Sequence, residues 1–286
     1  MHHDDHHDGG LIEDLAHIEA ARRRRLLGFL AGLGGMTALG MTACGGGSSA
    51  STSDTSTGSS SGSGGTTTTT TTGSCSVIPE ETSGPYPGDG SNTANGSIAN
   101  ALALTGIVRS DIRSSIAGAS GTATGVPLTL TIELVNTNGS CADLSGYGIY
   151  VWHCDAAGRY SMYSSGVTAE NYLRGVQSTG SDGTVTFTTV FPGCYAGRVP
   201  HIHFEIYLNA TMATSYAHKL NTSQLTFPLD TCATVYADSR YPSSAANLRA
   251  ISFASDGVFA DGVTTQLATV TGSVADGYAA TLTIGI

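Results

Sequence analysis

The chain has 286 residues, a formal net charge of −10 and a single lysine, Lys219. Charged residues make up only 12% of the sequence, which argues against nucleic acid as a partner because phosphate binding needs basic patches. The length allows one or two domains.

The first 44 residues are predicted to be an export signal. The chain starts with the solvated, His/Asp-rich leader MHHDDHHDGG, and the basic run Arg22–Arg25 precedes a Gly-rich apolar stretch. A basic region before an apolar one is typical of secretory signals, and paired arginines suggest the twin-arginine route. Met41-Thr-Ala-Cys44 is similar to a lipobox, so Cys44 is a candidate for lipid attachment and membrane anchoring. An ordinary cleaved signal and an uncleaved anchor are the alternatives.

Residues 45–74 are predicted to be a disordered linker. They consist almost entirely of Gly, Ser, Ala and Thr, a composition that cannot bury a core. Random-coil scaling gives roughly 30 such residues a reach of about 30 Å. The linker would separate Cys44 from a folded domain over 75–286.

Short apolar runs from Cys75 onwards predict an all-β domain. In residues 128–135 apolar side chains alternate with polar or smaller ones, which is the period of a half-buried strand. Several short strands with Gly-rich turns indicate a sandwich or a barrel. Turn signals lie at Asn138-Gly139, Asp182-Gly183 and Asp256-Gly257. The predicted strands are 102–109, 128–135, 148–153, 184–191, 201–207, 213–218, 264–271 and 279–286.

Five cysteines lie in the predicted domain, and an odd number leaves at least one thiol unpaired. Disulfides suit an exported protein. Cys154 lies in Trp-His-Cys-Asp at the end of a predicted strand, so we expect it to be free. The expected pairs are Cys75–Cys141 and Cys194–Cys232, although spacing alone does not define connectivity.

One stretch carries most of the candidate chemistry: Phe191-Pro-Gly-Cys-Tyr-Ala-Gly-Arg-Val-Pro-His-Ile-His-Phe204. Its end predicts a strand, on which side chains two residues apart share a face and the rise is about 3.3 Å per residue. His201 and His203 can therefore reach one metal ion, with Tyr195 and Arg198 close by in sequence. A bare His-x-His pair is equally compatible with two surface or core histidines.

Three further stretches accompany this one. Tyr150-Val-Trp-His-Cys-Asp-Ala-Ala-Gly-Arg-Tyr-Ser161 places Tyr160 just after a predicted turn, and we expect Trp152, His153 and Asp155 to be packing and supporting residues. The other two are Arg174-Gly-Val-Gln177 and Pro79-Glu-Glu-Thr-Ser-Gly-Pro-Tyr-Pro87.

Together the four stretches resemble the intradiol ring-cleavage dioxygenases, the family of catechol and protocatechuate 3,4-dioxygenases, and above all its exported, lipoprotein-like bacterial members. The resemblance covers about Cys75 to the C-terminus. It implies a β-sandwich of mixed and antiparallel strands with one non-haem Fe(III) ion, held by Tyr160, Tyr195, His201 and His203. Phenolate is a hard donor suited to ferric iron, and a bound cation stabilises the anion of a side chain whose free pKa is about 10. The alternative places both tyrosines in the core or at its rim.

The resemblance also implies a reaction: Fe(III)-dependent intradiol cleavage of a catechol-type ring with O2 to a muconate-type dicarboxylate. Tyr195 would leave the metal and take up a substrate proton. Arg198 would bind substrate and stabilise negative charge developing on the ring, unless it forms a plain salt bridge. Pro85, Tyr86 and Gln177 would line the substrate cleft, although Gln177 could instead brace Tyr160.

The sequence departs from the family pattern in three respects. Arg-Gly-x-Gln is followed by Ser178-Thr-Gly-Ser-Asp182 instead of Thr-Asp, and Cys194 stands where an aromatic residue is common. A Cys194–Cys232 disulfide would stiffen the loop of Tyr195 and oppose its release from iron. The helical N-terminal dimerisation region of typical catechol dioxygenases has no counterpart, so the oligomeric state stays open.

Two other functions stay open at this point. The protein could be a tethered, metal-containing β-sandwich module that binds aromatic polymers or a glycan without turnover. It could also be a zinc-dependent hydrolase that uses His201 and His203. The candidate base of such a hydrolase, chosen by position alone, is Glu205.

Overall fold

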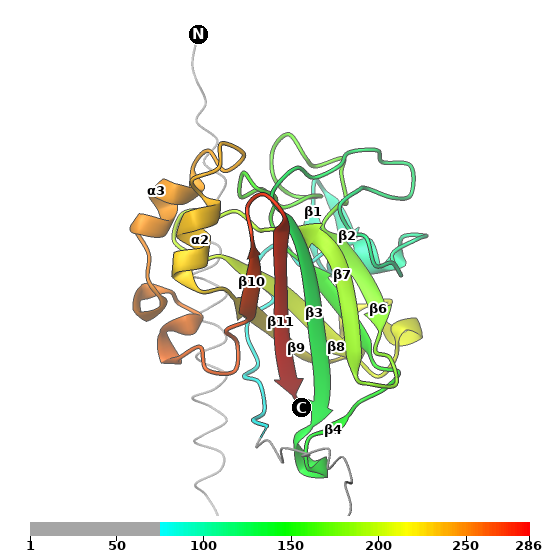
Figure 1. The fold of residues 1–286 in the computed structure, drawn as a ribbon. Coiled ribbons are helices and arrows are strands. Elements are labelled where there is room, and N and C mark those ends of the chain that lie inside the picture. Colours follow the sequence, from blue (N-terminus) through cyan, green and yellow to red (C-terminus); the bar gives the residue numbers. More distant parts are fainter. Residues whose placement is uncertain (1–74) are drawn as a thin grey trace, which may run out of the picture.

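The computed structural model of the protein describes residues 75–286. The predicted export signal, Cys44 and the linker lie outside these residues. Two β-sheets pack face to face, and short helices gather along one side of them (Figure 1). The predicted β-sandwich is therefore confirmed. Within 75–286 every helix is too short or too polar to span a bilayer.

The first sheet is built around β3 (Pro127–Asn136). This strand pairs antiparallel with β7 (Thr184–Val190) and, at its end, with β4 (Ala142–Asp143). On its other side it pairs parallel with β11 (Gly277–Gly285), which pairs antiparallel with β10 (Thr269–Ser273). Every second residue of β3 is buried against the second sheet, as the apolar alternation predicts.

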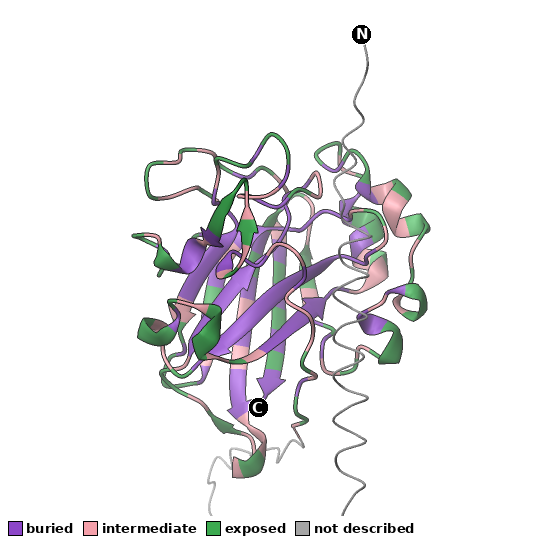
Figure 2. Cartoon of the chain, turned by 180° about the vertical axis from the view of Figure 1, so that it is seen from behind, coloured by how far each residue is buried: buried purple, intermediate pink, exposed green. Residues whose placement is uncertain are grey.

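The second sheet carries the candidate site. Its order is β6 (Arg174–Ser178), β5 (Gly148–Trp152), β8 (His201–Tyr207) and β9 (Lys219–Thr226), all antiparallel. Figure 2 views the molecule from this side and shows β5 and β8 buried along their length. Both faces of this sheet are therefore covered, one by the first sheet and the other by loops.

The two faces of β8 serve different purposes. Ile202, Phe204 and Ile206 point into the core between the sheets and are fully buried. His201 and His203 point to the opposite face, where a second apolar cluster includes Tyr150, Trp152, Tyr160 and Tyr207. A period of two thus separates core residues from candidate ligands on a single strand.

The remaining elements are short. β1 and β2 pair with each other as an antiparallel hairpin, and α2 and α3 follow β9 in the chain. Their bounds are β1 (Asp89–Ala94), β2 (Ser97–Asn100), α2 (Leu229–Val235) and α3 (Ser244–Arg249). The 3-10 helices are η1 (Ala101–Ala103), η2 (Thr137–Gly139), η3 (Ala210–Met212), η4 (Tyr216–His218), η5 (Phe253–Ser255) and η6 (Phe259–Asp261).

Two predicted strands are wrong. Residues 102–109 begin in η1, and Gly106 has a φ of +91°, a left-handed conformation that breaks an extended run. Residues 213–218 form a turn and η4, and the strand β9 follows them instead. β6, β9 and the β1–β2 hairpin were missed, because their side chains are too polar or too small to give a clear alternation.

The cysteines follow the prediction in part. Cys75 and Cys141 form a disulfide, and Cys154 is free, as expected. The expected Cys194–Cys232 pair is wrong, because both thiols are free and buried in the core between the sheets. Buried thiols pack there as small apolar side chains. The loop that carries Tyr195 is therefore not held by a disulfide to Cys232.

We expect the Cys75–Cys141 disulfide to contribute about 2 to 4 kcal/mol to the free energy of unfolding, because it closes a long loop in the unfolded chain. The two cysteines lie 66 positions apart. Denaturant unfolding of the Cys75→Ser/Cys141→Ser variant would measure the loss. The matched control is Cys154→Ser, because Cys154 is a free cysteine and closes no loop. A reducing agent should lower the stability of this variant by as much as it lowers that of the wild type.

Candidate metal centre

The structure brings the side chains of Tyr160, Tyr195, His201 and His203 together. The phenol oxygens of Tyr160 and Tyr195 lie 3.3 Å and 3.2 Å from the same atom, Nε2 of His201. The ring of His203 lies 4.8 Å from the ring of His201 and 6.2 Å from that of Tyr160. Residues spread over 44 positions of the sequence thus meet at one point.

Tyr160 is placed by a tight turn. The Asp155 carboxylate accepts hydrogen bonds from the amides of Ala157 and Arg159, at 2.9 Å and 3.0 Å. Gly158 in this turn has a φ of +83°, and a Cβ there would lie 3.1 Å from Cβ of Tyr195. A glycine at this position therefore permits both the turn and the close approach of the two tyrosine-bearing loops.

His201 presents one nitrogen to the phenols. Its Nδ1 lies 2.6 Å from the carbonyl oxygen of Val199, which can only accept, so Nδ1 carries the proton and Nε2 keeps its lone pair. Burial, with the charge of Arg198 as the next cause, lowers the pKa of His201 to about 3. The imidazole is neutral at physiological pH, as a metal ligand must be.

His203 is held by packing. Its ring stacks on Trp152 with centroids 4.8 Å apart and planes within 5°. Its buried Nδ1 has no hydrogen-bond partner among residues 75–286, although buried polar atoms normally have one. Burial and the neighbouring His201 hold the pKa of His203 well below its ordinary value, so this imidazole is also neutral.

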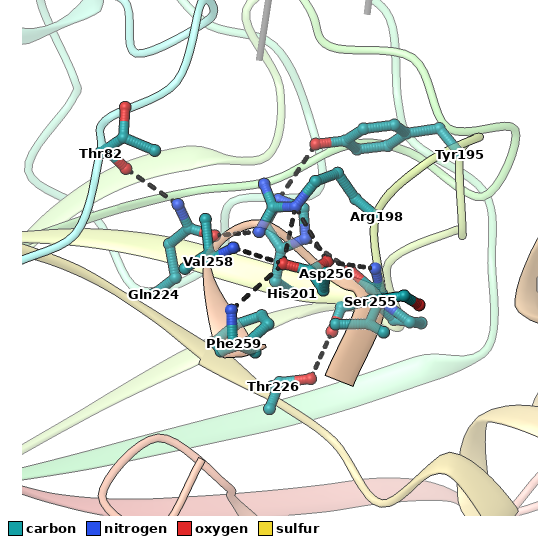
Figure 3. A network of polar contacts seen from close by, with 12 residues as sticks. Thr82, Tyr195, Arg198, His201, Gln224, Thr226, Ser255, Asp256, Val258 and Phe259 are labelled. Carbon is teal, nitrogen blue, oxygen red and sulfur yellow. Dashed lines mark hydrogen bonds and ion pairs between the residues drawn. The ribbon is translucent and has the colours of Figure 1, made fainter. Parts of the chain in front are cut away.

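Arg198 lies beside these rings in a buried network that Figure 3 shows from close by. Its Nε donates to both carboxylate oxygens of Asp256, at 3.2 Å and 3.0 Å, and its Nη2 donates to Oε1 of Gln224 at 2.7 Å. Gln224 in turn donates to the carbonyl of Thr82 at 2.9 Å. The predicted arginine is therefore also one half of a buried ion pair with Asp256, whose side chain is 0% exposed.

Tyr86 forms a wall of the centre. Its ring lies 5.0 Å from the ring of Tyr160 and 5.3 Å from that of Tyr163. The carbonyl of Pro85 accepts a hydrogen bond from Asn92 at 2.6 Å, which ties the segment to β1. The structure thus places Tyr86 next to Tyr160, whereas the contact shown for Pro85 is the one with Asn92 in β1.

Arg174 clamps two loops of the centre. Its buried guanidinium donates to the carbonyls of Tyr86, Pro87 and Ser161, at 2.9 Å, 2.7 Å and 3.0 Å. It also donates to the Ser161 hydroxyl at 3.1 Å and to the Tyr150 hydroxyl at 3.2 Å. The wall residue Tyr86 and the ligand candidate Tyr160 are therefore positioned by one side chain. Sequence reasoning singled out Arg174 only as the first residue of its motif.

The structure does not bring Gln177 to the centre, which corrects the prediction for this residue. The period of two along β6 turns Gln177 away from Arg174 and Val176, which face the second cluster. The Gln177 amide donates to the carbonyl of Thr186 in β7. Its contact is therefore with the first sheet and not with Tyr160 or Tyr86.

The donor set fits a ferric ion better than zinc. Residues 75–286 contain no group of three or more His, Cys, Asp and Glu side chains arranged to hold a metal. The further oxygen donors next to His201 are the phenol groups of the two tyrosines. Phenolate oxygen is a hard anionic donor, whereas zinc sites use cysteine, histidine and carboxylate ligands.

Comparison with known proteins finds that dioxygenases are similar to this chain. Residues 109–238 match the family model described as Dioxygenase. An intradiol ring-cleavage dioxygenase from Tetranychus urticae is 27% identical over 74% of this chain and 95% of its own, with a TM-score of 0.53. The crystal structure of a second dioxygenase is 26% identical over 74% of this chain and 94% of its own, with a TM-score of 0.54. No protein with a curated description matches.

The fold and the family match together define the chain as a dioxygenase of the β-sandwich kind. More particularly, the chain is similar to an intradiol ring-cleavage dioxygenase, a member of the family that its sequence motifs indicate.

Proposed function

We propose that the protein catalyses the Fe(III)-dependent intradiol cleavage of a catechol-type ring with O2, giving a muconate-type dicarboxylate. The observation that carries the proposal is the convergence of two phenol oxygens, 3.3 Å and 3.2 Å away, on Nε2 of His201 beside the ring of His203. Tyr160, Tyr195, His201 and His203 would hold the iron. When bound, a ferric ion would supply a Lewis acid that binds both diol oxygens and activates the ring towards O2.

The two tyrosines have different roles in this proposal. Tyr160 is 2% exposed, whereas Tyr195 is half-buried on a loop next to the exposed Ala196. With Cys194 and Cys232 both free, no disulfide between them restrains the Tyr195 side chain. Tyr160 would therefore stay in place, and the Tyr195 oxygen would swing aside and accept a proton from a substrate hydroxyl.

The surrounding residues would orient the diol and stabilise its charge. Arg198, whose positive charge acts on both His201 and His203, would stabilise the negative charge that develops on the ring. Tyr86 would cover the bound ring from the side of Tyr160 and exclude water. The substrate is thus expected to be a flat aromatic diol with its two oxygens towards the four ligand side chains.

We expect the iron-loaded protein to be coloured and to consume one O2 per catechol, forming a product heavier than the diol by one O2. Tyr195→Phe should bind iron more weakly and, per bound iron, lose about 10² in kcat, because removal of a proton acceptor costs about 10²- to 10⁴-fold. Oxygen uptake measures the O2 consumed and kcat, the product mass shows whether one O2 was added, and metal analysis measures the bound iron. Tyr216→Phe, at an exposed residue of η4, is the matched control and should behave as wild type.

The same experiment tests the main alternative. A protein that binds catechol tightly but yields no ring-opened product at any iron loading would be a tethered binding module, and the proposed reaction would be wrong. In that case Tyr195→Phe would change little.

The zinc hydrolase finds less support. Glu205, its candidate base, lies on the same face as the histidines but accepts a hydrogen bond from Tyr207 at 2.7 Å and pairs with Lys219 at 3.2 Å. Both contacts hold the carboxylate at the Tyr207 end of β8. Zinc instead of iron in protein purified from its native compartment would favour the hydrolase.

We also infer that the protein works outside the cytoplasm. The Cys75–Cys141 disulfide supports this, because such bonds persist in oxidising compartments, and the basic run before an apolar stretch is typical of an exported chain. Anchoring through Cys44 is part of the same proposal. Cell fractionation and mass spectrometry of the mature N-terminus would test it, and an intact N-terminus in the cytoplasm would contradict it.

A further inference from the structure

The Asp256 carboxylate is surrounded by donors. It accepts from Nε of Arg198 and from three backbone amides: that of Val199 at 2.8 Å, of Val258 at 2.8 Å and of Phe259 at 3.3 Å. The side chain is 0% exposed. An ionised carboxylate only accepts hydrogen bonds, so it matches this shell, whereas an asparagine would aim its NH2 group at other donors.

Charge reinforces this match. Burial raises the pKa of Asp256, but the charge of Arg198 and the amides of Val199 and Val258 outweigh it and leave the pKa below its ordinary value. The carboxylate is therefore ionised at neutral pH. The Arg198 side chain, which is 1% exposed, has its counter-charge here.

The same carboxylate is connected to His201 through one residue, Val199. Asp256 Oδ2 holds the amide of Val199, and the carbonyl of Val199 accepts from Nδ1 of His201 at 2.6 Å. Figure 3 shows Asp256 next to Arg198, on the side away from Tyr195. One residue thus orients both the charged group and a ligand candidate of the centre.

We propose that Asp256 is a positioning residue of this centre: its buried carboxylate sets the direction of the Arg198 guanidinium and, through the backbone of Val199, the tautomer and orientation of His201. Asp256 touches neither the metal ligands' donor atoms nor the expected substrate site. The part that concerns turnover rests on the proposed function, whereas the part that concerns His201 does not.

Two consequences distinguish this role from a purely structural one. The tautomer of His201 should depend on Asp256 even without iron, because outer partners of a ligating histidine select its protonated nitrogen. Misdirection of Arg198 should lower kcat more than it raises KM, because Arg198 acts on charge that develops during the reaction. Replacement of a residue that only stabilises the fold would change neither the His201 tautomer nor kcat below the melting temperature.

The experiment compares wild type, Asp256→Asn, Arg198→Lys and Asp238→Asn. Asp238 is the matched control, since its carboxylate also pairs with an arginine, Arg240, at 2.7 Å, but on the surface. Nitrogen-15 NMR of the iron-free proteins reports the His201 tautomer, and steady-state kinetics per bound iron, well below each melting temperature, report kcat and KM for catechol. Circular dichroism verifies folding.

We expect Asp256→Asn to lose the pure Nδ1-protonated signal of His201 and about 10- to 100-fold in kcat. Arg198→Lys should have a lower kcat but keep the wild-type tautomer of His201. This variant tests the effect of Arg198 on kcat even if Asp256→Asn does not fold. An unchanged tautomer or an unchanged kcat in Asp256→Asn would overturn the proposal, as would an altered tautomer in Arg198→Lys. If wild type itself shows no turnover, the proposed function fails, and the NMR signal alone decides the role of Asp256.

Discussion

His201→Ala should abolish stoichiometric iron binding. Nε2 of His201 is the atom on which both phenol oxygens converge, at 3.3 Å and 3.2 Å, so its removal takes away the centre of the ligand set. Loss of a mere outer partner of a metal ligand costs about 10- to 100-fold in affinity, and loss of the ligand itself should exceed 100-fold. Iron content after dialysis and the visible absorption of the loaded protein are the measurements.

The control for this variant is His218→Ala. His218 lies on η4 with an exposed side chain that contacts Thr214 and Met212. Its replacement should leave iron content, colour and oxygen uptake at wild-type levels. Equal iron retention by the His201 and His218 variants would place the metal elsewhere and remove the basis of the proposed reaction.

Arg174→Met should lower the free energy of unfolding by about 3 to 5 kcal/mol, because buried carbonyl oxygens that lose their donors cost about 1 to 3 kcal/mol each. Without Arg174 the carbonyls of Tyr86 and Ser161 lose this donor, whereas that of Pro87 keeps the Tyr150 hydroxyl as a donor at 2.8 Å. For a domain of this size the loss corresponds to a fall in melting temperature of about 6 to 20 °C. Calorimetry or circular dichroism would measure it.

The same variant should weaken the centre as well as the fold. Without the clamp, the segment of Tyr86 and the loop of Tyr160 lose their common support, so iron affinity should fall by about 10-fold. Arg249→Met, at the exposed end of α3, is the matched control and should change the melting temperature by less than about 2 °C. A variant at Arg174 as stable as this control would show that the five hydrogen bonds carry little net free energy.

Arg174 and Asp256 have a common physical role. Each is a buried charged group whose hydrogen bonds reach segments distant in sequence, 87 positions from Arg174 to Pro87 and 58 from Arg198 to Asp256. Arg174 holds the loops of Tyr86 and Ser161, and Asp256 holds Arg198 and Val199, directly before β8. The candidate ligands are therefore supported from two sides by charge-assisted hydrogen bonds, which are stronger than neutral ones.

Local sequence patterns were sufficient to predict the sandwich, the strand of His201 and His203, and the turn before Tyr160. Each of these depends on a short period or on turn residues, which neighbours in the sequence specify. The order of the four motifs was sufficient to indicate the family. It was also sufficient to select Tyr160 and Tyr195 from the twelve tyrosines of the chain.

The remaining features depend on contacts between distant segments. Gln177 turned out to face the first sheet because of the register of β6, and Cys194 and Cys232 stayed free in the core, which no spacing rule foresees. Asp256 looked like part of an ordinary Asp-Gly turn until the fold placed it against Arg198 and Val199. Burial, counter-charge and hydrogen-bond satisfaction are properties of the packed chain, so only the tertiary structure could assign these residues.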